Sequence, residues 1–324
     1  MTLRHILAAD IGGTNCRFGL FAHDADGLRL LYSVWRRTED LHTAEDVLRA
    51  WDASNPSLPA AEADALVLAV AGPVLNPLCG YLTHADLQLD LRGITTRHGP
   101  GRTRLINDFT AQAYACLTPV GEQAHRVLPA SATESEHEHG TKGIVGAGTG
   151  FGTATLIRDS TGAWLALPAE GGHTAFPFAG REEEAFHAFV RQELRYPYAR
   201  SDDVLTGLGL TLLHRFLTGN ALSPQEVAAV ALAEDTPTRR WYARFYGRAC
   251  RNWILTTLCR GGLYLAGGIA AKNPAVPACP EFADELYNTP HYLDLLKSVP
   301  VLLNADENSG LWGAAWVGTR LTPW

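Results

Sequence analysis

The chain has 324 residues, of which 46% are hydrophobic and 19% are charged, and its formal net charge at pH 7 is −7. This composition indicates a globular protein with a well-buried core and excludes a disordered or fibrous one. The charge is modest and spread along the chain, so we expect no nucleic-acid or membrane surface, and an anionic ligand has to be held locally. One hydrophobic core usually stops growing at roughly 250–300 residues, so the length predicts two lobes.

Six cysteines are spread through apolar or helical segments, with no C-x-x-C pair among them. This spacing predicts buried, reduced thiols rather than disulfides. The chain has no apolar run near the roughly 20 residues of a spanning helix, and its start lacks the pattern of a secretion signal. We therefore expect a cytoplasmic protein that does not associate with membranes.

Taken in chain order, the first predicted elements are two strands, over residues 6–9 and 16–21, joined by the glycine turn of "ILAADIGGTNCRFGLF". The segment "ADALVLAVAGPV" from residue 63 predicts a buried strand that ends at a Gly-Pro break. In "TRLINDFTAQAYACL" the apolar period changes from strand to helix at Asn107 and Asp108. Both side chains are therefore expected at the carboxyl end of a strand, where open α/β sheets bind ligands.

The segment at residues 143–157, "GIVGAGTGFGTATLI", repeats the strand, glycine turn and strand of the first segment, which suggests two related lobes. Apolar residues at helical spacing then predict helices in "REEEAFHAFVRQEL", in "SPQEVAAVALAE" and over residues 239–258. A third glycine turn, Gly267-Gly268, follows the apolar strand of "GGLYLAGGIAAKN". The last segment, "NSGLWGAAWVGTRL", predicts a helix that could return to the first lobe.

One polar segment, "ASATESEHEHGT", lies ahead of the second glycine turn and predicts an exposed loop. It contains His137 and His139, whose imidazoles are of the type that binds metals. A solvated loop accounts for both residues, so we assign no metal site to it.

The three glycine turns, each after an apolar strand, are hard to explain as turns alone. Without Cβ atoms, a phosphate can approach the consecutive backbone N–H groups of such a turn closely. Asp10, beside the first turn, has the chemistry to orient a nucleophile or to hold the hydration shell of Mg²⁺; a purely structural hairpin turn is the alternative for this stretch alone. Neither the P-loop pattern nor the G-x-G-x-x-G spacing of dinucleotide folds is present.

In order along the chain, "DIGGTN", "INDF", "GAGTGFG", "PAEGGH", "LAGGI" and "ENSGLWGAAW" resemble the bacterial glucokinase family of the sugar kinase/Hsp70/actin superfamily. The resemblance covers nearly the whole chain. It implies an α/β fold of the two-lobed, actin-like ATPase (ribonuclease H-like) type, with a sugar and ATP cleft between a small α/β domain and a larger α+β domain. We expect the small domain at residues 1–110 with 306–324, and the large domain at 111–305.

The resemblance implies a catalytic base toward the sugar 6-hydroxyl at Asp108, and sugar ligands at Asn107, Glu170, His173 and Asp202. The dipole of a helix that begins at Asp108 stabilises its carboxylate and weakens it as a base. Phosphoryl transfer tolerates this, because its loose transition state needs an oriented nucleophile more than early proton removal. The alternative is an Asp108 that only caps the helix, a role worth about 1 kcal/mol, and the two roles are compatible.

The resemblance also implies ATP as the phosphoryl donor and Mg²⁺ as its metal. The positions that match nucleotide and phosphate contacts in the family are Asp10, Gly12, Gly13, Thr14, Asn15, Gly148, Thr149, Gly150, Gly267 and Gly268. Among these, Asp10 matches the residue that supports the hydrated Mg²⁺.

Glu170 and His173 are separated by two glycines, a spacing that lets both side chains face one pocket. A carboxylate can bridge two adjacent hydroxyls, and a neutral imidazole can accept from one hydroxyl and donate elsewhere. No cysteine cluster follows "GGH", which separates the chain from the Cys-rich repressor/ORF/kinase group and argues against zinc.

Two positions depart from the family pattern. Asp202 stands where the family usually has glutamate, and the lost methylene withdraws the carboxylate by roughly 1.3 Å. Either the backbone compensates, or water bridges the gap to that sugar hydroxyl. In "YLTHADL", Asp86 replaces an aromatic residue. Both departures bear on sugar affinity and epimer choice, not on phosphoryl transfer.

The sequence thus predicts transfer of the ATP γ-phosphoryl group to the 6-hydroxyl of a hexose, with glucose favoured. Sugar binding would close the lobes and exclude water. One alternative is a kinase for another hexose or an N-acetylated amino sugar, which Asp202 allows. The other is a sugar-sensing regulator, which the presence of both Asp10 and Asp108 disfavours. The resemblance also favours a homodimer.

Overall fold

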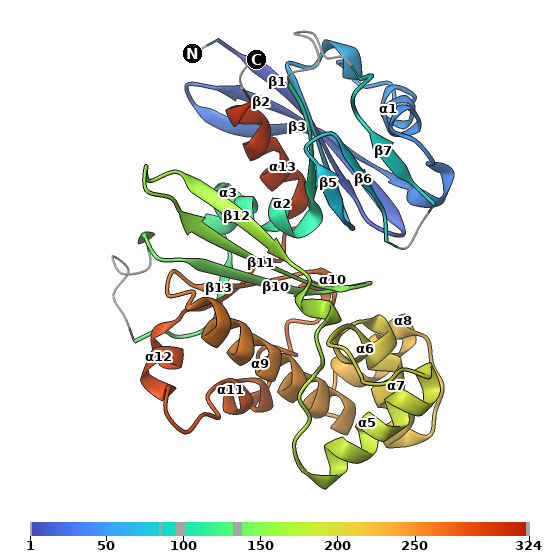
Figure 1. Ribbon diagram of the computed structural model, residues 1–324, viewed down its shortest axis with the longest axis vertical. Helices are drawn as coiled ribbons and strands as arrows, with labels where there is room; N and C mark the ends of the chain where they lie inside the picture. Colours follow the sequence, from blue (N-terminus) through green and yellow to red (C-terminus); the bar gives the residue numbers. More distant parts are fainter. Residues whose placement is uncertain (1, 84–85, 95–101, 132–137, 322–324) are drawn as a thin grey trace. The chain divides into compact units, whose positions relative to one another are not determined.

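The computed structural model describes residues 2–83, 86–94, 102–131 and 138–321 (Figure 1). The chain divides into two compact units, one of residues 1–123 with 306–324 and one of residues 124–305. The boundary expected after residue 110 falls inside helix α2 (Asp108–Ala115). This helix packs against the C-terminal helix α13 (Ser309–Arg320), and residues 111–123 therefore group with the first unit.

The first unit is built on a five-stranded sheet with the order β3-β2-β1-β4-β8. Its strands are β1 (Arg4–Ile11), β2 (Asn15–Asp24), β3 (Gly27–Arg37), β4 (Ala65–Val70) and β8 (Thr103–Asn107). The strands β1 to β3 form an antiparallel meander, whereas β1, β4 and β8 run parallel. The two strands around the first glycine turn and the switch from strand to helix at residue 108 are confirmed, and β3 was not predicted.

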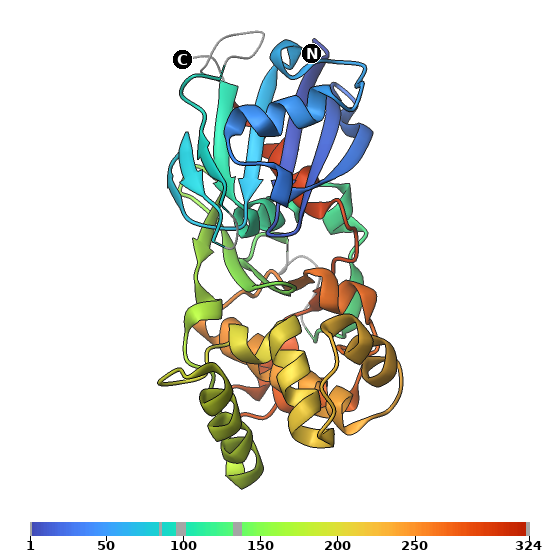
Figure 2. The ribbon, with the colours of Figure 1, turned by 90° about the vertical axis from the view of Figure 1, so that its right-hand side faces the viewer.

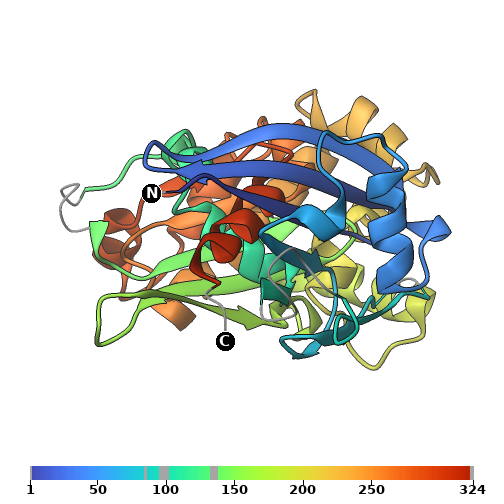
Figure 3. The ribbon, with the colours of Figure 1, turned by 90° about the horizontal axis from the view of Figure 1, so that it is seen from above.

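Alternate residues of β1 enter two separate cores, because successive side chains of a strand point to opposite faces. On one face, α1 (Ala44–Asp52) packs Val47 and Trp51 over the strands. On the other face, α13 packs Leu311 and Ala314 over the same strands, beside α2. Figure 2 shows α1 in front of the blue strands, and Figure 3 shows the red α13 alongside β1 to β3. Both faces of the sheet are therefore covered at β1 and β4, whereas the edge strand β3 has no fully buried residue.

The remaining elements of the first unit are short. A separate three-stranded sheet joins β5, β6 and β7. The bounds are β5 (Val74–Asn76), β6 (Cys79–Tyr81), β7 (Gln88–Asp90), α3 (Pro119–Glu122), and the 3₁₀ helices η1 (Thr38–Asp40) and η2 (Ala60–Glu62).

The second unit repeats the strand order of the first. Its six-stranded sheet has the order β12-β11-β10-β13-β14-β9, in which β10 to β12 form the antiparallel meander and β10, β13 and β14 run parallel. The strands are β9 (His125–Leu128), β10 (Lys142–Ala147), β11 (Phe151–Arg158), β12 (Trp164–Ala169), β13 (Leu263–Ala266) and β14 (Val301–Leu303). The repeat predicted from the glycine-turn segments is confirmed.

Helices form the rest of the second unit, around the long helix α9 (Figure 1). They are α5 (Gly180–Leu194), α6 (Asp202–Leu205), α7 (Gly207–Thr218), α8 (Pro224–Val227), α9 (Pro237–Thr257), α10 (Gly268–Lys272), α11 (Pro280–Leu286), α12 (Leu293–Ser298) and the 3₁₀ helix η4 (Gly171–His173). The single helix predicted for "SPQEVAAVALAE" begins as α8 and widens into a π-helix, η5 (Ala228–Leu232).

The structure also tests the predictions about cysteine pairing and membrane-spanning helices. All six cysteines are free thiols, five of them buried and Cys79 half-buried. Within the part of the chain that the structure describes, every helix is too short or too polar to cross a bilayer.

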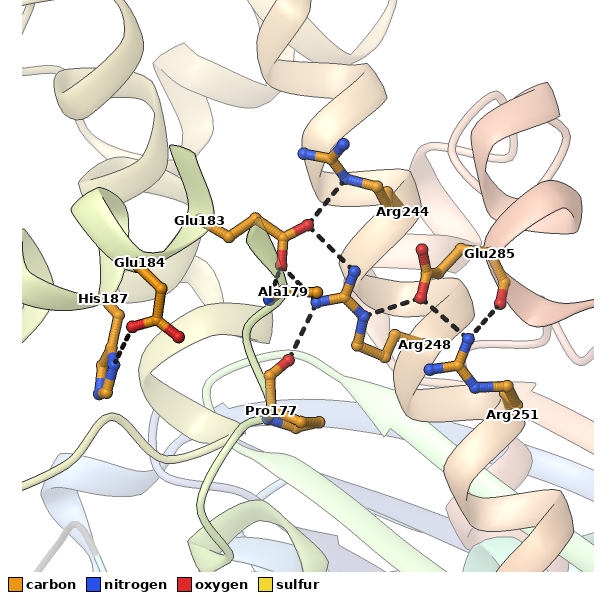
Figure 4. Close-up of polar contacts among 9 residues, drawn as sticks. All are labelled: Pro177, Ala179, Glu183, Glu184, His187, Arg244, Arg248, Arg251 and Glu285. Carbon is orange, nitrogen blue, oxygen red and sulfur yellow. Dashed lines mark hydrogen bonds and ion pairs between the residues drawn. The ribbon is translucent and has the colours of Figure 1, made fainter. Parts of the chain in front are cut away.

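A buried network of ion pairs joins α5, α9 and α11 (Figure 4). The Arg248 side chain is 4% exposed, and its Nε donates to Glu285 Oε1 at 2.8 Å while Nη2 donates to Glu183 Oε1 at 3.0 Å. Arg251 Nη1 also donates to Glu285 Oε1, at 2.9 Å. Burial alone would raise the pKa of Glu285, but the hydrogen bonds and charges of the two arginines outweigh it and lower that pKa.

Replacing Arg248 with methionine should lower the free energy of unfolding by about 3–5 kcal/mol, because the buried Glu183 and Glu285 both lose the guanidinium between them and keep only Arg244 and Arg251. Urea unfolding at pH 7 measures this. The matched control is Arg215→Met on α7, which breaks the half-exposed pair of Arg215 with Glu193 and should cost about 1 kcal/mol or less. Equal losses in the two variants would contradict the prediction.

The stability that Glu285 contributes to this network should depend on pH. Because the pKa of Glu285 is lowered in the folded protein, its contribution is complete above the ordinary glutamate value of about 4.3 and is lost as the pH falls through the folded value. The gap in stability between wild type and Glu285→Gln should therefore narrow below about pH 4. Unfolding curves recorded from neutral to acidic pH test this.

Candidate active site

The first glycine turn, Gly12–Asn15, connects β1 to β2. The Gly12 N–H donates to the Asn15 carbonyl at 3.0 Å, which closes the turn. Thr38 anchors it from outside: its Oγ1 donates to the Gly12 carbonyl at 2.7 Å and its N–H donates to the Thr14 carbonyl at 3.0 Å. Thr38 is fully buried. Sequence analysis missed this residue, because no local pattern marks a threonine so far along the chain as the support of this turn.

Asp10 lies at the end of β1 with its side chain 16% exposed. Its Oδ2 is 3.9 Å from Arg17 Nη1 on β2. It also fills the space beside Gly310 at the start of α13, where an added Cβ would be only 2.4 Å from Oδ2. Burial raises the pKa of Asp10, and the positive charge of Arg17 opposes that shift. A bound cation would therefore favour the ionised form of this carboxyl.

The surroundings of Asp10 suit one kind of metal site. Across residues 2–83, 86–94, 102–131 and 138–321, no three His, Cys, Asp or Glu side chains gather as a metal site. Mg²⁺ is commonly held by one or two carboxylates together with water and substrate phosphates. Asp10 beside a glycine turn fits Mg²⁺ that arrives with a phosphate ligand, and the residues do not fit a site built from protein ligands alone.

Asn107 and Asp108 form the junction of β8 and α2. The Asn107 side chain is the N-cap: its Oδ1 accepts from Phe109 N–H at 2.9 Å and from Thr110 N–H at 3.2 Å. Its Nδ2 donates to the Gly72 carbonyl at 3.3 Å. The alternative in which Asp108 caps the helix is therefore wrong. Asp108 is instead the first residue of α2 and half-buried, at the positive end of the helix dipole.

Register places these groups at one edge of the first sheet. Asp10 pairs with Ala69 and Ile11 with Val70, and Val70 in turn pairs with Asn107 on β8. Asn107 thus lies two strands from Ile11, which corresponds to about 10 Å. The structure brings Asp10, the first glycine turn and Asp108 together at the carboxyl edge of the parallel strands.

The other two glycine turns are neighbours in the second unit. In the turn at residues 148–150, Gly148 N–H donates to the Gly150 carbonyl at 2.9 Å, and the Gly148 carbonyl accepts from Gly207 N–H at 3.1 Å. Gly267 has φ +84°, and a Cβ there would be 2.6 Å from the carbonyl oxygen of Ala147. A Cβ on Gly148 would be 3.9 Å from the N atom of Gly268. These two predicted nucleotide turns therefore form one continuous backbone surface.

Glu170 and His173 lie together after β12. The two side chains are 69% and 44% exposed, and His173 Nε2 is 3.8 Å from Glu170 Oε2. The glycines between them are required by packing, since a Cβ on Gly172 would be 2.2 Å from the Phe151 carbonyl oxygen and 2.4 Å from Asp202 Oδ1. The segment is thus held close against β11.

Asp202, the third candidate sugar ligand in this unit, is bound to backbone. Its Oδ1 accepts from Phe151 N–H at 2.7 Å, at the point where β11 leaves the glycine turn at residues 148–150. This carboxylate therefore ties the start of α6 to that turn and lies against Gly172 at the same time.

Three further residues were singled out in the sequence, namely Asp86, His137 and His139. Asp86 is exposed, and its carbonyl lies 3.3 Å from His42 Nδ1. His139 is exposed. His137 lies outside the described residues.

Comparison with known proteins identifies the family to which the chain belongs. The family model described as Glucokinase matches residues 7–320. The chain belongs to the glucokinase family. It is 32% identical over 331 residues to a glucokinase of Caulobacter vibrioides (strain NA1000 / CB15N), covering 98% of this chain and 95% of that one. It is also 30% identical over 321 residues to a glucokinase of Neisseria meningitidis serogroup C (strain 053442), with 95% and 93% covered.

Solved structures agree in fold. A glucokinase from an Antarctic psychrotroph superimposes with a TM-score of 0.80 at 24% identity, covering 98% of this chain and 99% of that one. A ROK hexokinase from Thermus thermophilus gives a TM-score of 0.63 at 18% identity, with 97% of each chain covered. The actin-like ATPase fold expected for this glucokinase-family chain is confirmed.

Substitution of Gly172 by alanine should destabilise the protein by about 1–3 kcal/mol, because the new methyl group overlaps the Phe151 carbonyl and the Asp202 carboxylate. Gly150→Ala is the matched control: a Cβ there has nothing within 4 Å, so its effect should stay within about 0.5 kcal/mol. Urea unfolding measures both. A Gly172→Ala protein as stable as the control would refute this account of the loop.

Proposed function

We propose that this member of the glucokinase family transfers the γ-phosphoryl group of ATP to the 6-hydroxyl of a hexose, glucose above all, to give glucose 6-phosphate and ADP. The observation that carries the proposal is the placement of Asp10, the glycine turn and Asp108 at one edge of the first sheet. Curated relatives at 30–32% identity are named glucokinases, which supports the choice of substrate.

Asp108 would orient the 6-hydroxyl and accept its proton as the new O–P bond forms and the bond from the γ-phosphorus to the leaving oxygen of ADP breaks. Its position at the start of α2 favours the ionised carboxylate. That makes it a weak early base and a good acceptor for a late proton, which suits a loose transition state. Asn107 supports this role, since its amide fixes the turn that carries Asp108.

The glycine turns are the proposed phosphate contacts, in the first unit at Gly12, Gly13, Thr14 and Asn15 and in the second at Gly148, Thr149, Gly150, Gly267 and Gly268. Mg²⁺ bound with the nucleotide would neutralise charge on the phosphates. Asp10 would hold its water shell from the end of β1.

Glu170 and His173 are the proposed sugar ligands of the second unit, supported by their mutual distance of 3.8 Å and their partial exposure. Phe151 N–H occupies Oδ1 of Asp202, so this carboxylate would contact a sugar hydroxyl through Oδ2 or through a bridging water. This engagement favours, as the second candidate, a kinase for another hexose or an N-acetylated amino sugar. A homodimer stays a prediction from the family resemblance, and a cytoplasmic location stays a prediction from the sequence pattern.

The first experiment is a coupled assay of ADP release with Mg·ATP against glucose, mannose, galactose, fructose, N-acetylglucosamine and N-acetylmannosamine, with a control that contains no sugar. We expect turnover to be highest with glucose. Highest turnover with another sugar would move the substrate assignment to the second candidate. Absence of any sugar-dependent release would refute the kinase and favour a regulator that only binds sugar.

Asp108→Asn should lower kcat by about 10²–10⁴-fold, because the amide cannot accept the hydroxyl proton. Glucose affinity should change little, since the amide keeps the size of the carboxyl and one acceptor oxygen for the sugar hydroxyl. Steady-state kinetics and calorimetric glucose titration separate the two effects. A variant with near-normal kcat would show that Asp108 is not the base.

Thr38→Val should raise the KM for Mg·ATP about tenfold, because the turn at Gly12 loses the hydroxyl that holds its carbonyl. The KM for sugar should change much less. Thr38→Ser, which keeps the hydroxyl, is the control and should restore most of the nucleotide affinity. If serine and valine behave alike, the hydrogen bond to Gly12 does not shape the turn.

A further inference from the structure

Arg200 connects His173 to a buried carboxylate. The Arg200 Nη1 lies 3.2 Å from His173 Nδ1, while Nε and Nη2 donate to Asp203 Oδ2 and Oδ1 at 3.0 and 2.7 Å. The Asp203 side chain is 1% exposed, and its Oδ2 also accepts from the Arg200 backbone N–H at 2.9 Å. Two parallel hydrogen bonds fix the plane of a guanidinium, so Arg200 approaches His173 in a set direction.

Backbone pairing keeps the two residues beside each other. Phe176 N–H donates to the Ala199 carbonyl at 2.9 Å, and Ser201 N–H donates to the Thr174 carbonyl at 3.0 Å. A β-bridge between Ala175 and Arg200 lies at the centre of this pairing. The segment that follows His173 and the segment that carries Arg200 therefore move together.

The contact determines which nitrogen of His173 carries the proton. A guanidinium has N–H donors and no acceptor, and its bonds to Asp203 raise the pKa of Arg200 further. Nδ1 of His173 must therefore accept. In the neutral ring the proton then lies on Nε2, which is the nitrogen 3.8 Å from Glu170 Oε2.

We propose that Arg200, held by Asp203, is a positioning residue that fixes His173 as an Nε2–H donor toward the sugar. This proposal rests on the proposed function for the identity of the ligand. His173 then donates to a sugar oxygen, while the neighbouring Glu170 carboxylate accepts from a hydroxyl. The pair thereby selects a group that both accepts and donates, which is what a hydroxyl does. The freedom of the imidazole to accept or to donate, expected from the sequence, is removed.

The test reads the proton directly, by NMR of protein labelled with ¹⁵N-histidine and free of substrate. The His173 signals are those absent from His173→Gln. In the wild type we expect the shift of Nδ1 to be that of an unprotonated nitrogen and the shift of Nε2 that of a protonated one. Arg200→Met should mix the two tautomers, and Arg200→Lys, which still donates, should keep the wild-type pattern.

Steady-state kinetics test whether the contact between Arg200 and His173 affects the KM for the sugar. Using the best sugar of the panel, Arg200→Met should raise the KM for that sugar about tenfold and leave kcat within about twofold. Arg200→Lys should recover most of the loss. Arg215→Met, which removes an arginine from a half-exposed ion pair, should change neither the histidine shifts nor the KM.

Arg200→Met leaves the Asp203 carboxylate buried without its partner, so the double variant Arg200→Met with Asp203→Asn repeats both measurements without that charge. A protonated Nδ1 in the wild type would overturn the proposal. His173 shifts that are unchanged in both Arg200→Met and the double variant would overturn it as well. So would an unchanged sugar KM in the double variant. Absence of sugar-dependent turnover in the wild type would refute the proposed function instead. The nitrogen shifts report the tautomer of His173 whether or not the wild type turns over a sugar.

Discussion

Parallel pairing of β1, β4 and β8 is the constraint on which the candidate site of the first unit depends. Parallel strands end at a common edge, so residues far apart in the chain, such as Asp10 and Asn107, lie at the same edge of the sheet with only β4 between them. A slip of one residue would send every side chain to the opposite face. Both faces of the sheet are buried at β1, and the packing of Ile6 on one face and Leu7 on the other therefore fixes the register that aims Asp10 toward α13.

The C-terminal helix makes that arrangement possible, because it comes unusually close to its neighbours. Gly310 leaves room for the Asp10 carboxylate, and Gly313 lies against the backbone of α2, where an added Cβ would be 1.7 Å from the Ala111 carbonyl oxygen. A side chain at either position would push α13 away from β1 or from the helix that Asp108 begins. The last helix of the chain thus helps to position groups that lie near its beginning.

How far the sequence predicts this molecule depends on whether the signal is local. The strand-to-helix switch at Asn107 is local and was found, and β3 had a local signal too, the Asp26-Gly27 pair with Gly27 at φ +103°, which is typical of a tight hairpin. The supports of the site are not local. Thr38 contacts a turn formed by residues 12–15, and Asp202 contacts residue 151. No period or spacing in a single sequence indicates such contacts. A role for Asp202 could be predicted from the family pattern, but its hydrogen bond to the backbone of residue 151 could not.

The start of α6 shows how two adjacent carboxylates can serve two different loops. Asp202 is bound to the end of the glycine turn at residues 148–150, whereas the next residue, Asp203, holds Arg200 against His173. Successive residues of a helix point in directions about 100° apart, so one short turn can hold both loops at once. The turn proposed for phosphate and the segment proposed for sugar are therefore anchored to the same few residues. A movement of α6 would displace both, which links nucleotide and sugar contacts inside a single unit of the fold.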